Sequence, residues 1–141
     1  MTAEGKPVPD ILPETREYWE AASRGELLVQ TCCSCGSKQY FPRLLCHRCL
    51  SEDLGWTKSS GMGTVYSYTV IHQAAHQTFA PDVPYVYAII ELDEGVRMIS
   101  NVVNTDVSKV HIGMKVKVFF HRLSDTISIP RFEPVQQADT E

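Results

Sequence analysis

Two pairs of cysteines have the spacing of a metal site. Two residues separate the members of each pair and ten separate the pairs, which are Cys32 with Cys35 and Cys46 with Cys49. A pair of this kind can turn two thiolates toward one cation, and two pairs complete the tetrahedron that Zn²⁺ prefers. Four protein ligands leave no position open for water, so the spacing predicts structural zinc and not catalytic zinc. The competing interpretation is that these cysteines are free or form disulfides.

The fifth cysteine, Cys33, does not fit this spacing, because Cys32 and not Cys33 lies three positions before Cys35. We assign no role to it. The chain starts with polar residues and contains no apolar run of membrane-spanning length, so we expect a cytoplasmic protein that does not associate with a membrane. Thiols stay reduced in the cytoplasm, which favours a metal site over disulfides.

The metal-binding segment is locally basic although the chain has a net charge of −4. Between Thr31 and Ser51 the charged side chains are Lys38, Arg43 and Arg48, and no Asp or Glu is present. These cations could offset a zinc site whose four thiolates leave a net charge of about −2. They could instead contact a phosphate or an acidic partner, and the residues alone leave both interpretations open.

No other group of residues predicts catalysis. The chain lacks a G-x-S-x-G motif, a phosphate-binding glycine loop and an H-E-x-x-H motif. His72 and His76 would share a face only on a helix, whereas their surroundings favour strands. We therefore expect no catalytic residues in this chain. The acidic balance and the pI near 5.7 also argue against a general nucleic-acid binder, which normally carries a basic surface.

The chain before the cysteines predicts an extended arm and a short helix. Residues 1–12 contain prolines and little apolar content, which is typical of an arm. Residues 13–26 begin with proline and acids and end at a glycine, which are helix start and stop signals. A helix this short is unstable alone, so its aromatic stripe of Tyr18 and Trp19 must pack on something. Either the chain's own core or a partner subunit would satisfy that need.

Residues 27–60 have the layout of a zinc ribbon. Segments 27–31 and 39–41 read as strands that lead into the first cysteine pair and away from it. In such a subdomain the metal replaces a hydrophobic core that is too small to form. We expect Trp56 to pack at the junction between subdomains; the alternative is that it stacks on a base or another ligand.

Residues 61–135 alternate with a period of two and predict a small barrel. The expected strands are 65–72, 84–92, 96–103, 115–120 and 126–130. Five strands with a connection between the third and fourth suit a closed OB-type barrel, so the fold class is mostly β. The loop at 74–84 carries Phe79, which could dock a partner or fold back as a lid. Residues 136–141 should be a frayed tail.

Several motifs together resemble a known family, the rubredoxin-like zinc ribbon plus OB-fold proteins associated with acyl-CoA enzymes and long catalogued as a domain of unknown function. The resemblance covers roughly residues 10 to 135, and its motifs are Pro-Glu-Thr-Arg-Glu-Tyr-Trp-Glu at 13–20, Gly25-Glu26-Leu27, the two cysteine pairs, Phe41-Pro42-Arg43, Gly-Met-Gly-Thr-Val-Tyr-Ser-Tyr-Thr at 61–69, Pro84-Tyr85 and Gly113-Met114-Lys115-Val116. As a set these motifs are specific, although each is weak alone.

The resemblance implies a non-catalytic accessory subunit of a heteromeric thiolase-type complex that acts on acyl-CoA thioesters, in thiolytic or retro-aldol carbon–carbon cleavage. A thiolase-like partner would supply the catalytic cysteine and histidines, while this chain would serve assembly and shape a CoA and acyl passage shared with the partner. The family does not fix the CoA contacts. Our candidates are Lys38, Arg43 and Arg48 for the CoA phosphates and Tyr18, Trp19 and Phe79 for docking.

A single-stranded nucleic-acid-binding module is the alternative function, because zinc ribbons and OB barrels also bind nucleic acids. Tyrosines on the barrel strands could stack bases, and these are Tyr66, Tyr68, Tyr85 and Tyr87. The acidic balance of the chain counts against this alternative.

Overall fold

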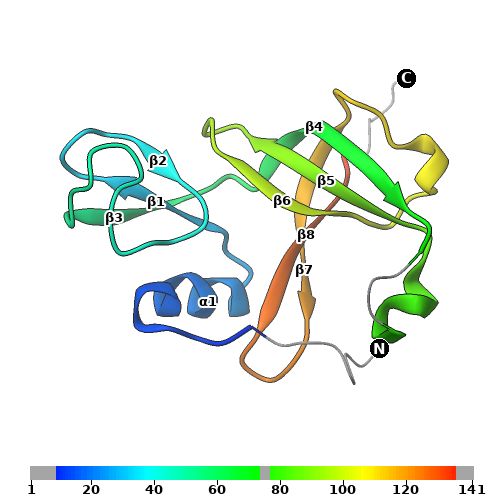
Figure 1. Cartoon of the computed structure of the whole chain (residues 1–141), viewed down its shortest axis with the longest axis horizontal. Helices are drawn as coiled ribbons and strands as arrows, with labels where there is room; N and C mark the ends of the chain where they lie inside the picture. Colours follow the sequence, from blue (N-terminus) through cyan, green and yellow to red (C-terminus); the bar gives the residue numbers. More distant parts are fainter. Residues whose placement is uncertain (1–8, 74–76, 136–141) are drawn as a thin grey trace.

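The computed structural model describes residues 9–73 and 77–135, and it contains a small three-stranded sheet, a closed barrel and one α-helix (Figure 1). The predicted tail, the first eight residues of the predicted arm, and His76 lie outside the described residues, as does the side chain of Phe79. The mostly β fold class with an N-terminal helix, a cysteine cluster and a five-stranded barrel is confirmed. Within the described residues, no helix has the length and apolar character needed to cross a membrane.

The N-terminal helix is short and is held by packing. A 3₁₀ turn, η1 (Pro13–Thr15), leads into α1 (Arg16–Ser23), and the chain leaves α1 through Gly25, whose φ is +84°. Glycine adopts this left-handed conformation without the steric cost that other residues meet. Eight residues do not form a stable helix alone, so α1 depends on the apolar face that it buries against the ribbon and the barrel.

Tyr18 and Trp19 belong to the chain's own core and not to an exposed docking surface. Their exposed fractions are 0% and 5%, and their ring centroids lie 4.9 Å apart in an edge-to-face arrangement. The hydroxyl of Tyr18 is hydrogen-bonded to that of Tyr40 at 2.6 Å, and its ring also packs edge-to-face on Phe41. The direct docking role expected for Tyr18 and Trp19 is therefore wrong, because this aromatic cluster buries both side chains where it joins α1 to the ribbon.

The ribbon sheet has the strand order β2-β1-β3, with β1 (Leu28–Cys32) at its centre. β2 (Lys38–Gln39) is brief. β3 (Leu54–Lys58) pairs antiparallel with the whole of β1, from Leu28 opposite Lys58 to Cys32 opposite Leu54. β3 is absent from the strands predicted above, because it contains a glycine and has no fully buried residue to produce a clear alternating pattern. Its conformation follows from pairing with β1.

Trp56 of β3 sits between the ribbon and α1. Its side chain is partly buried against the core, and its indole Nε1 donates a 2.8 Å hydrogen bond to Glu17 of α1. This position matches the packing role that we expected at a junction, with the helix as the second partner. The nearby linker to the barrel is fixed by Glu94, which accepts hydrogen bonds from the Ser59 hydroxyl and the Ser60 N–H.

The barrel closes in the order β4-β5-β6-β8-β7, which is the OB-type arrangement. Its strands are β4 (Met62–Ile71), β5 (Tyr85–Leu92), β6 (Arg97–Val102), β7 (Lys115–Arg122) and β8 (Ser128–Pro134), with η2 (Gln77–Asp82) and η3 (Val107–Lys109) in the connections. The alternating residues of these strands fill the interior, and the fully buried ones include Val65, Val86, Ile90, Val116 and Phe132. This interior explains the period of two in the sequence.

β4 pairs with both β5 and β7, and glycines permit its close contacts. A Cβ at Gly63 would lie 2.8 Å from Cγ2 of Ile90 and 2.9 Å from the carbonyl oxygen of Glu91. A Cβ at Gly61 would lie 2.7 Å from a methyl of Val118. Since real Cβ atoms do not approach other atoms so closely, these glycines are required by packing between the first barrel strand and its neighbours.

Candidate metal centre and the adjoining cationic hollow

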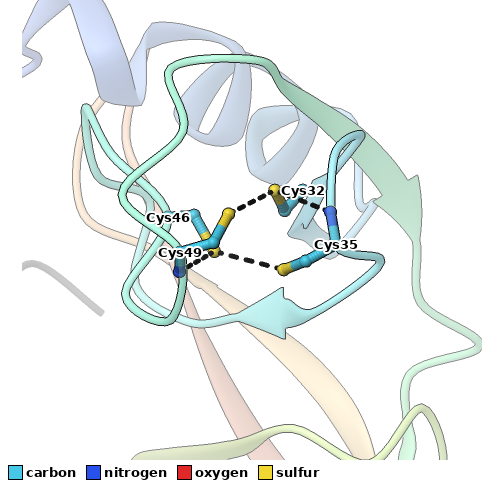
Figure 2. A group of neighbouring side chains, drawn as sticks. All are labelled: Cys32, Cys35, Cys46 and Cys49. Carbon is cyan, nitrogen blue, oxygen red and sulfur yellow. Dashed lines mark hydrogen bonds between the residues drawn. The ribbon is translucent and has the colours of Figure 1, made fainter.

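The four paired cysteines converge on one point between two loops (Figure 2). All four sulfur atoms lie within 4.8 Å of one another, with 3.5 Å from Cys32 to Cys49 and 3.7 Å from Cys35 to Cys46. A zinc ion with four Zn–S bonds of about 2.3 Å gives sulfur–sulfur edges of about 3.8 Å. The cysteines are free thiols, which excludes the disulfide interpretation for this structure. The donor set and its size therefore fit zinc.

The two loops that carry these cysteines have the same backbone structure, and we call them the first and second knuckles (32–36 and 46–50). In the first, the N–H of Gly36 donates to the carbonyl of Cys32 at 2.9 Å; in the second, the N–H of Leu50 donates to the carbonyl of Cys46 at 3.0 Å. The residue that closes each knuckle has a positive φ, +79° at Gly36 and +64° at Leu50. Each C-x2-C pair thus needs a left-handed residue directly after it.

Backbone N–H groups point at the sulfurs of both knuckles. The N–H of Cys35 lies 3.4 Å from the sulfur of Cys32, and the N–H groups of Arg48 and Cys49 lie 3.3 and 3.5 Å from that of Cys46. Such donors favour the thiolate over the thiol. These backbone donors therefore favour the form of the cysteines that binds a cation.

The thiols influence one another's ionisation. Hydrogen bonds from the backbone N–H of Cys35 lower the pKa of Cys32, and those from the side chain and backbone of Ser37 lower the pKa of Cys35 to about 6. The N–H of Ser51 lowers the pKa of Cys49, but hydrogen bonding with neighbouring thiols and burial together raise it to about 12. A bound zinc ion would favour the thiolate form of its ligands, because its positive charge offsets theirs.

Two buried glutamines hold the second knuckle in place. Gln30 of β1 and Gln39 of β2 are directly opposite each other, and their exposed fractions are 4% and 5%. Gln30 accepts from the N–H of Arg43 at 2.8 Å and donates to its carbonyl at 2.9 Å. Gln39 donates to Gln30 at 2.7 Å. The pair therefore fixes the backbone where the chain enters the loop before Cys46.

Gln39 also binds the loop further along. Its Nε2 donates to the carbonyl of Leu45 at 3.2 Å, and its Oε1 accepts from the backbone N–H of His47 at 2.7 Å. The Nδ1 of His47 lies 2.6 Å from the same Oε1, so Nδ1 carries the proton in this contact. Because an amide can both donate and accept, Gln39 holds both sides of Cys46. The motifs in the sequence did not reveal this role, and its only sign is a polar residue inside a predicted ribbon strand.

Lys38 and Arg43 line one hollow of about 410 Å³ between the ribbon and the barrel, together with His47 and Arg97. Arg48, the third phosphate candidate, is not among its lining residues. The guanidinium of Arg97 lies 3.7 Å from the ring centroid of Tyr66, and its Nε lies 3.8 Å from a carboxylate oxygen of Glu91 in the same hollow. Across residues 9–73 and 77–135, no carboxylate pairs with Lys38 or Arg43. The hollow is therefore cationic on its ribbon side.

Two family models match consecutive parts of the chain. One, described as "ChsH2, rubredoxin-like zinc ribbon domain", matches residues 19–55, and the other, "ChsH2, C-terminal OB-fold domain", matches residues 56–121. A Methanocaldococcus jannaschii protein described as a "DUF35 domain-containing scaffold protein" is 38% identical over 111 residues, which are 78% of each chain. The chain belongs to the DUF35 family. The resemblance found in the sequence is thereby confirmed, and the zinc-ribbon family model and four-cysteine cluster together support structural zinc in this DUF35 protein.

Two further matches are described as an enzyme subunit and as an aldolase. A Thermomonospora curvata protein described as "Probable enoyl-CoA hydratase alpha subunit" is 34% identical over 129 residues, and this chain spans 40% of its length. A solved structure described as "Ltp2-ChsH2(DUF35) aldolase" matches with a TM-score of 0.78 at 34% identity, covering 89% of this chain and 98% of the matched chain.

Proposed function

We propose that this DUF35 protein is a non-catalytic accessory subunit of a heteromeric complex that acts on acyl-CoA thioesters, and that its zinc is structural. The observation that carries the proposal is a cluster of four cysteines that can fill every position around one zinc ion. The similar proteins are described as a scaffold, a hydratase subunit and an aldolase. Four thiolates fill a tetrahedral zinc site and leave no position for a reacting water. Zinc would then hold the two knuckles and not take part in a reaction.

We further propose that the catalytic partner is thiolase-like, acts in carbon–carbon bond cleavage, and depends on this chain for assembly and for the shape of the CoA and acyl passage. Each accessory chain would dock on one protomer of the partner, which gives a hetero-oligomer. The cytoplasm remains the expected location, because reduced thiols are needed for the metal site.

Lys38 and Arg43 are our candidates for the CoA phosphates, supported by their common hollow and by the lack of a carboxylate partner among the described residues. Cations that are free of internal ion pairs can form charge-assisted hydrogen bonds to a phosphate. Arg48 stays a weaker candidate, because it does not line that hollow. His47, which sequence reasoning missed, is a further lining residue whose ring is oriented by Gln39.

Co-expression with a thiolase-like protein from the same organism tests the function. We expect one peak in size-exclusion chromatography that contains both proteins, and cleavage of an acyl-CoA substrate that needs both. The double change Lys38→Ala with Arg43→Ala should raise KM for the CoA thioester, while Lys109→Ala, which removes an exposed lysine outside the hollow, is the control. A thiolase-like protein that is fully active alone and never co-elutes with this chain would overturn the proposal.

The tyrosines of the barrel do not favour nucleic-acid binding. Tyr66 and Tyr87 have exposed fractions of 44% and 47%, but the guanidinium of Arg97 covers one face of the Tyr66 ring. Tyr68 packs against the core and is partly buried. A continuous row of open rings, which base stacking along a single strand requires, is not formed by these residues of the described barrel.

A further inference from the structure

Three hollows follow one another along β6 on the outside of the barrel. The first is the cationic hollow, which takes Arg97 from this strand. The second, which we call the middle hollow, has a volume of about 210 Å³ and takes Ile99, Ser100 and Asn101. The third, the far hollow, has a volume of about 460 Å³ and takes residues 101–104. In Figure 1, β6 runs from the ribbon side of the barrel toward η3, so the hollows succeed one another in that direction.

Neighbouring hollows share walls. Tyr40 lines both the cationic and the middle hollow, while Tyr87 and Asn101 line both the middle and the far hollow. β8 contributes in the same order, with Ile129 in the middle hollow and Arg131 in the far one. The three hollows therefore adjoin one another along β6, and we call them together the seam groove.

The seam groove follows the place where the barrel is closed least tightly. β6 and β8 are parallel, and their register consists of one pair, Val102 opposite Phe132. The N–H of Val103 donates to the carbonyl of Phe132 at 2.7 Å, and the Ser100 hydroxyl donates to the carbonyl of Pro130 at 2.9 Å. Alternate residues of a strand direct their N–H and C=O groups to one side. Before Val102, the groups of β6 that face β8 are thus open to an extended ligand that carries amides.

The charge changes along the seam groove. In the cationic hollow, Lys38, Arg43 and Arg97 stand against one carboxylate, that of Glu91. The lining of the middle hollow, as far as the structure describes it, contains no charged residue, and its wall includes the buried Trp19. A groove with this distribution suits a ligand that has an anionic group at one end and an uncharged body beside it.

Two exposed apolar side chains line the middle hollow. Ile99 and Tyr87 have exposed fractions of 57% and 47%. The register sets Ile99 opposite Ile89 and Asn101 opposite Tyr87, so Ile99 and Tyr87 are diagonal neighbours on the outer face of the barrel. An apolar cavity of about 150 Å³ is large enough for benzene. The middle hollow is larger than this and admits a slender, partly apolar chain.

The length of the seam groove matches one part of CoA. A strand rises by about 3.3 Å per residue, so the step from Arg97 to Asn101 spans about 13 Å. The pantetheine arm has about a dozen bonds between its phosphate and its sulfur, as many as about four residues of extended backbone. Phosphates beside Arg97 would therefore place the sulfur near Asn101, where the middle hollow meets the far hollow.

The far hollow has the lining that an acyl group needs. Its apolar wall includes Val102, Val103 and Val107, and its charged residues are the oppositely charged Arg131 and Asp82. Burial lowers the pKa of Arg131, and the charge of Asp82 acts in the opposite direction. The Nε of Arg131 is buried without a hydrogen-bond acceptor among the described residues. The hollow thus combines apolar surface with a donor and no net charge.

We propose that the seam groove binds the uncharged part of a CoA thioester, with the pantetheine arm in the middle hollow and the acyl group in the far hollow. This inference rests on the proposed function, which placed only the phosphates, and deepens it. The thioester then lies at the outer face of the barrel beside Tyr87 and Asn101. A catalytic partner can reach it there.

Two ligands separate the arm from the phosphates in a calorimetric titration of the complex with the thiolase-like protein. S-Butyl-CoA is a thioether that cannot transfer its chain, and adenosine 3′,5′-bisphosphate has phosphates but no arm. Tyr87→Ala and Ile99→Ala should each weaken S-butyl-CoA binding about 5- to 30-fold and leave the bisphosphate within twofold. Lys38→Ala with Arg43→Ala should weaken both ligands. Ile112→Ala is the matched control, because Ile112 is 67% exposed and lines none of the three hollows.

The other outcomes contradict the inference in different ways. If S-butyl-CoA binds Tyr87→Ala and Ile99→Ala within twofold of the unmodified complex, the arm lies elsewhere and the accessory function stands. Equal weakening of both ligands would show that the groove does not hold the arm. If either variant no longer co-elutes with the partner, the groove holds a polypeptide segment instead. An unmodified chain that does not co-elute, or a complex that binds neither ligand, removes the proposed function as well.

Discussion

Replacing Gln39 with leucine should loosen the second knuckle although Gln39 is not a metal ligand. Leucine has a similar size and suits a buried position, so the change removes hydrogen bonds with little change in packed volume. The bonds that disappear are those to the carbonyl of Leu45, to the backbone and ring of His47, and to Gln30. The carbonyl and the N–H on either side of Cys46 then lose their partner.

The size of the effect follows from the number of groups left unpaired. Gln30 keeps its two bonds to Arg43, so the substitution leaves two backbone groups without a protein partner. An unsatisfied group costs about 1–3 kcal/mol when it is fully buried, and Leu45 and His47 lie near the surface, where water compensates in part. We expect a loss of about 2–4 kcal/mol, which lowers Tm by about 6–12 °C in a chain of this length.

Thermal unfolding followed by circular dichroism measures the loss, and the rate of zinc transfer to a chelator measures the loosening. Gln73→Leu is the matched control, because Gln73 is exposed on the barrel side and should leave Tm within about 1 °C. If Gln39→Leu shifts Tm no more than Gln73→Leu does and releases zinc at the same rate as the unmodified chain, the glutamine pair does not position the knuckle.

Two further predictions concern the barrel and the aromatic cluster. Gly63→Ala should destabilise the chain by about 1–3 kcal/mol in urea unfolding, because its Cβ would lie 2.8 Å from Ile90; an unchanged midpoint would show that β4 and β5 can separate without cost. Burial raises the pKa of Tyr40 to about 12 and that of Tyr18 well above its usual value. The unfolded tyrosines ionise near pH 10, so stability should be constant below about pH 9 and fall from about pH 10 to pH 12. Tyr40→Phe should reduce this fall, and an identical pH profile in that variant would refute the assignment.

The zinc ligands and the barrel were predictable because their signals are local. The spacing of Cys32, Cys35, Cys46 and Cys49 reflects the geometry of a knuckle, which needs only a few consecutive residues. The period of two in the barrel strands reflects one buried face per strand, as at Val86, Ala88 and Ile90 of β5. Both patterns are set by the chain within a short window, so neither requires knowledge of the packing.

The remaining features depend on contacts between distant segments. β3 is a strand because β1 lies beside it, and Gly55 and the partly exposed residues around it give no alternating signal. The glutamine pair becomes buried through the register that places Gln30 opposite Gln39. The stripe of Tyr18 and Trp19 correctly indicated an apolar face, but the sequence could not distinguish a partner from Tyr40 and the rest of the core. Pairing and register of this kind are not contained in one segment.

Loss of one zinc ligand tests most directly the claim that structural zinc holds a docking surface for another protein. In Cys46→Ser, zinc content per chain and co-elution with the thiolase-like protein are measured on the same preparation. Cys33→Ser is the control, since Cys33 is exposed and lies outside the four-sulfur cluster. We predict that Cys46→Ser loses zinc and co-elution together, while Cys33→Ser keeps both. A Cys46→Ser chain that has lost its zinc and still co-elutes with full affinity would contradict the account.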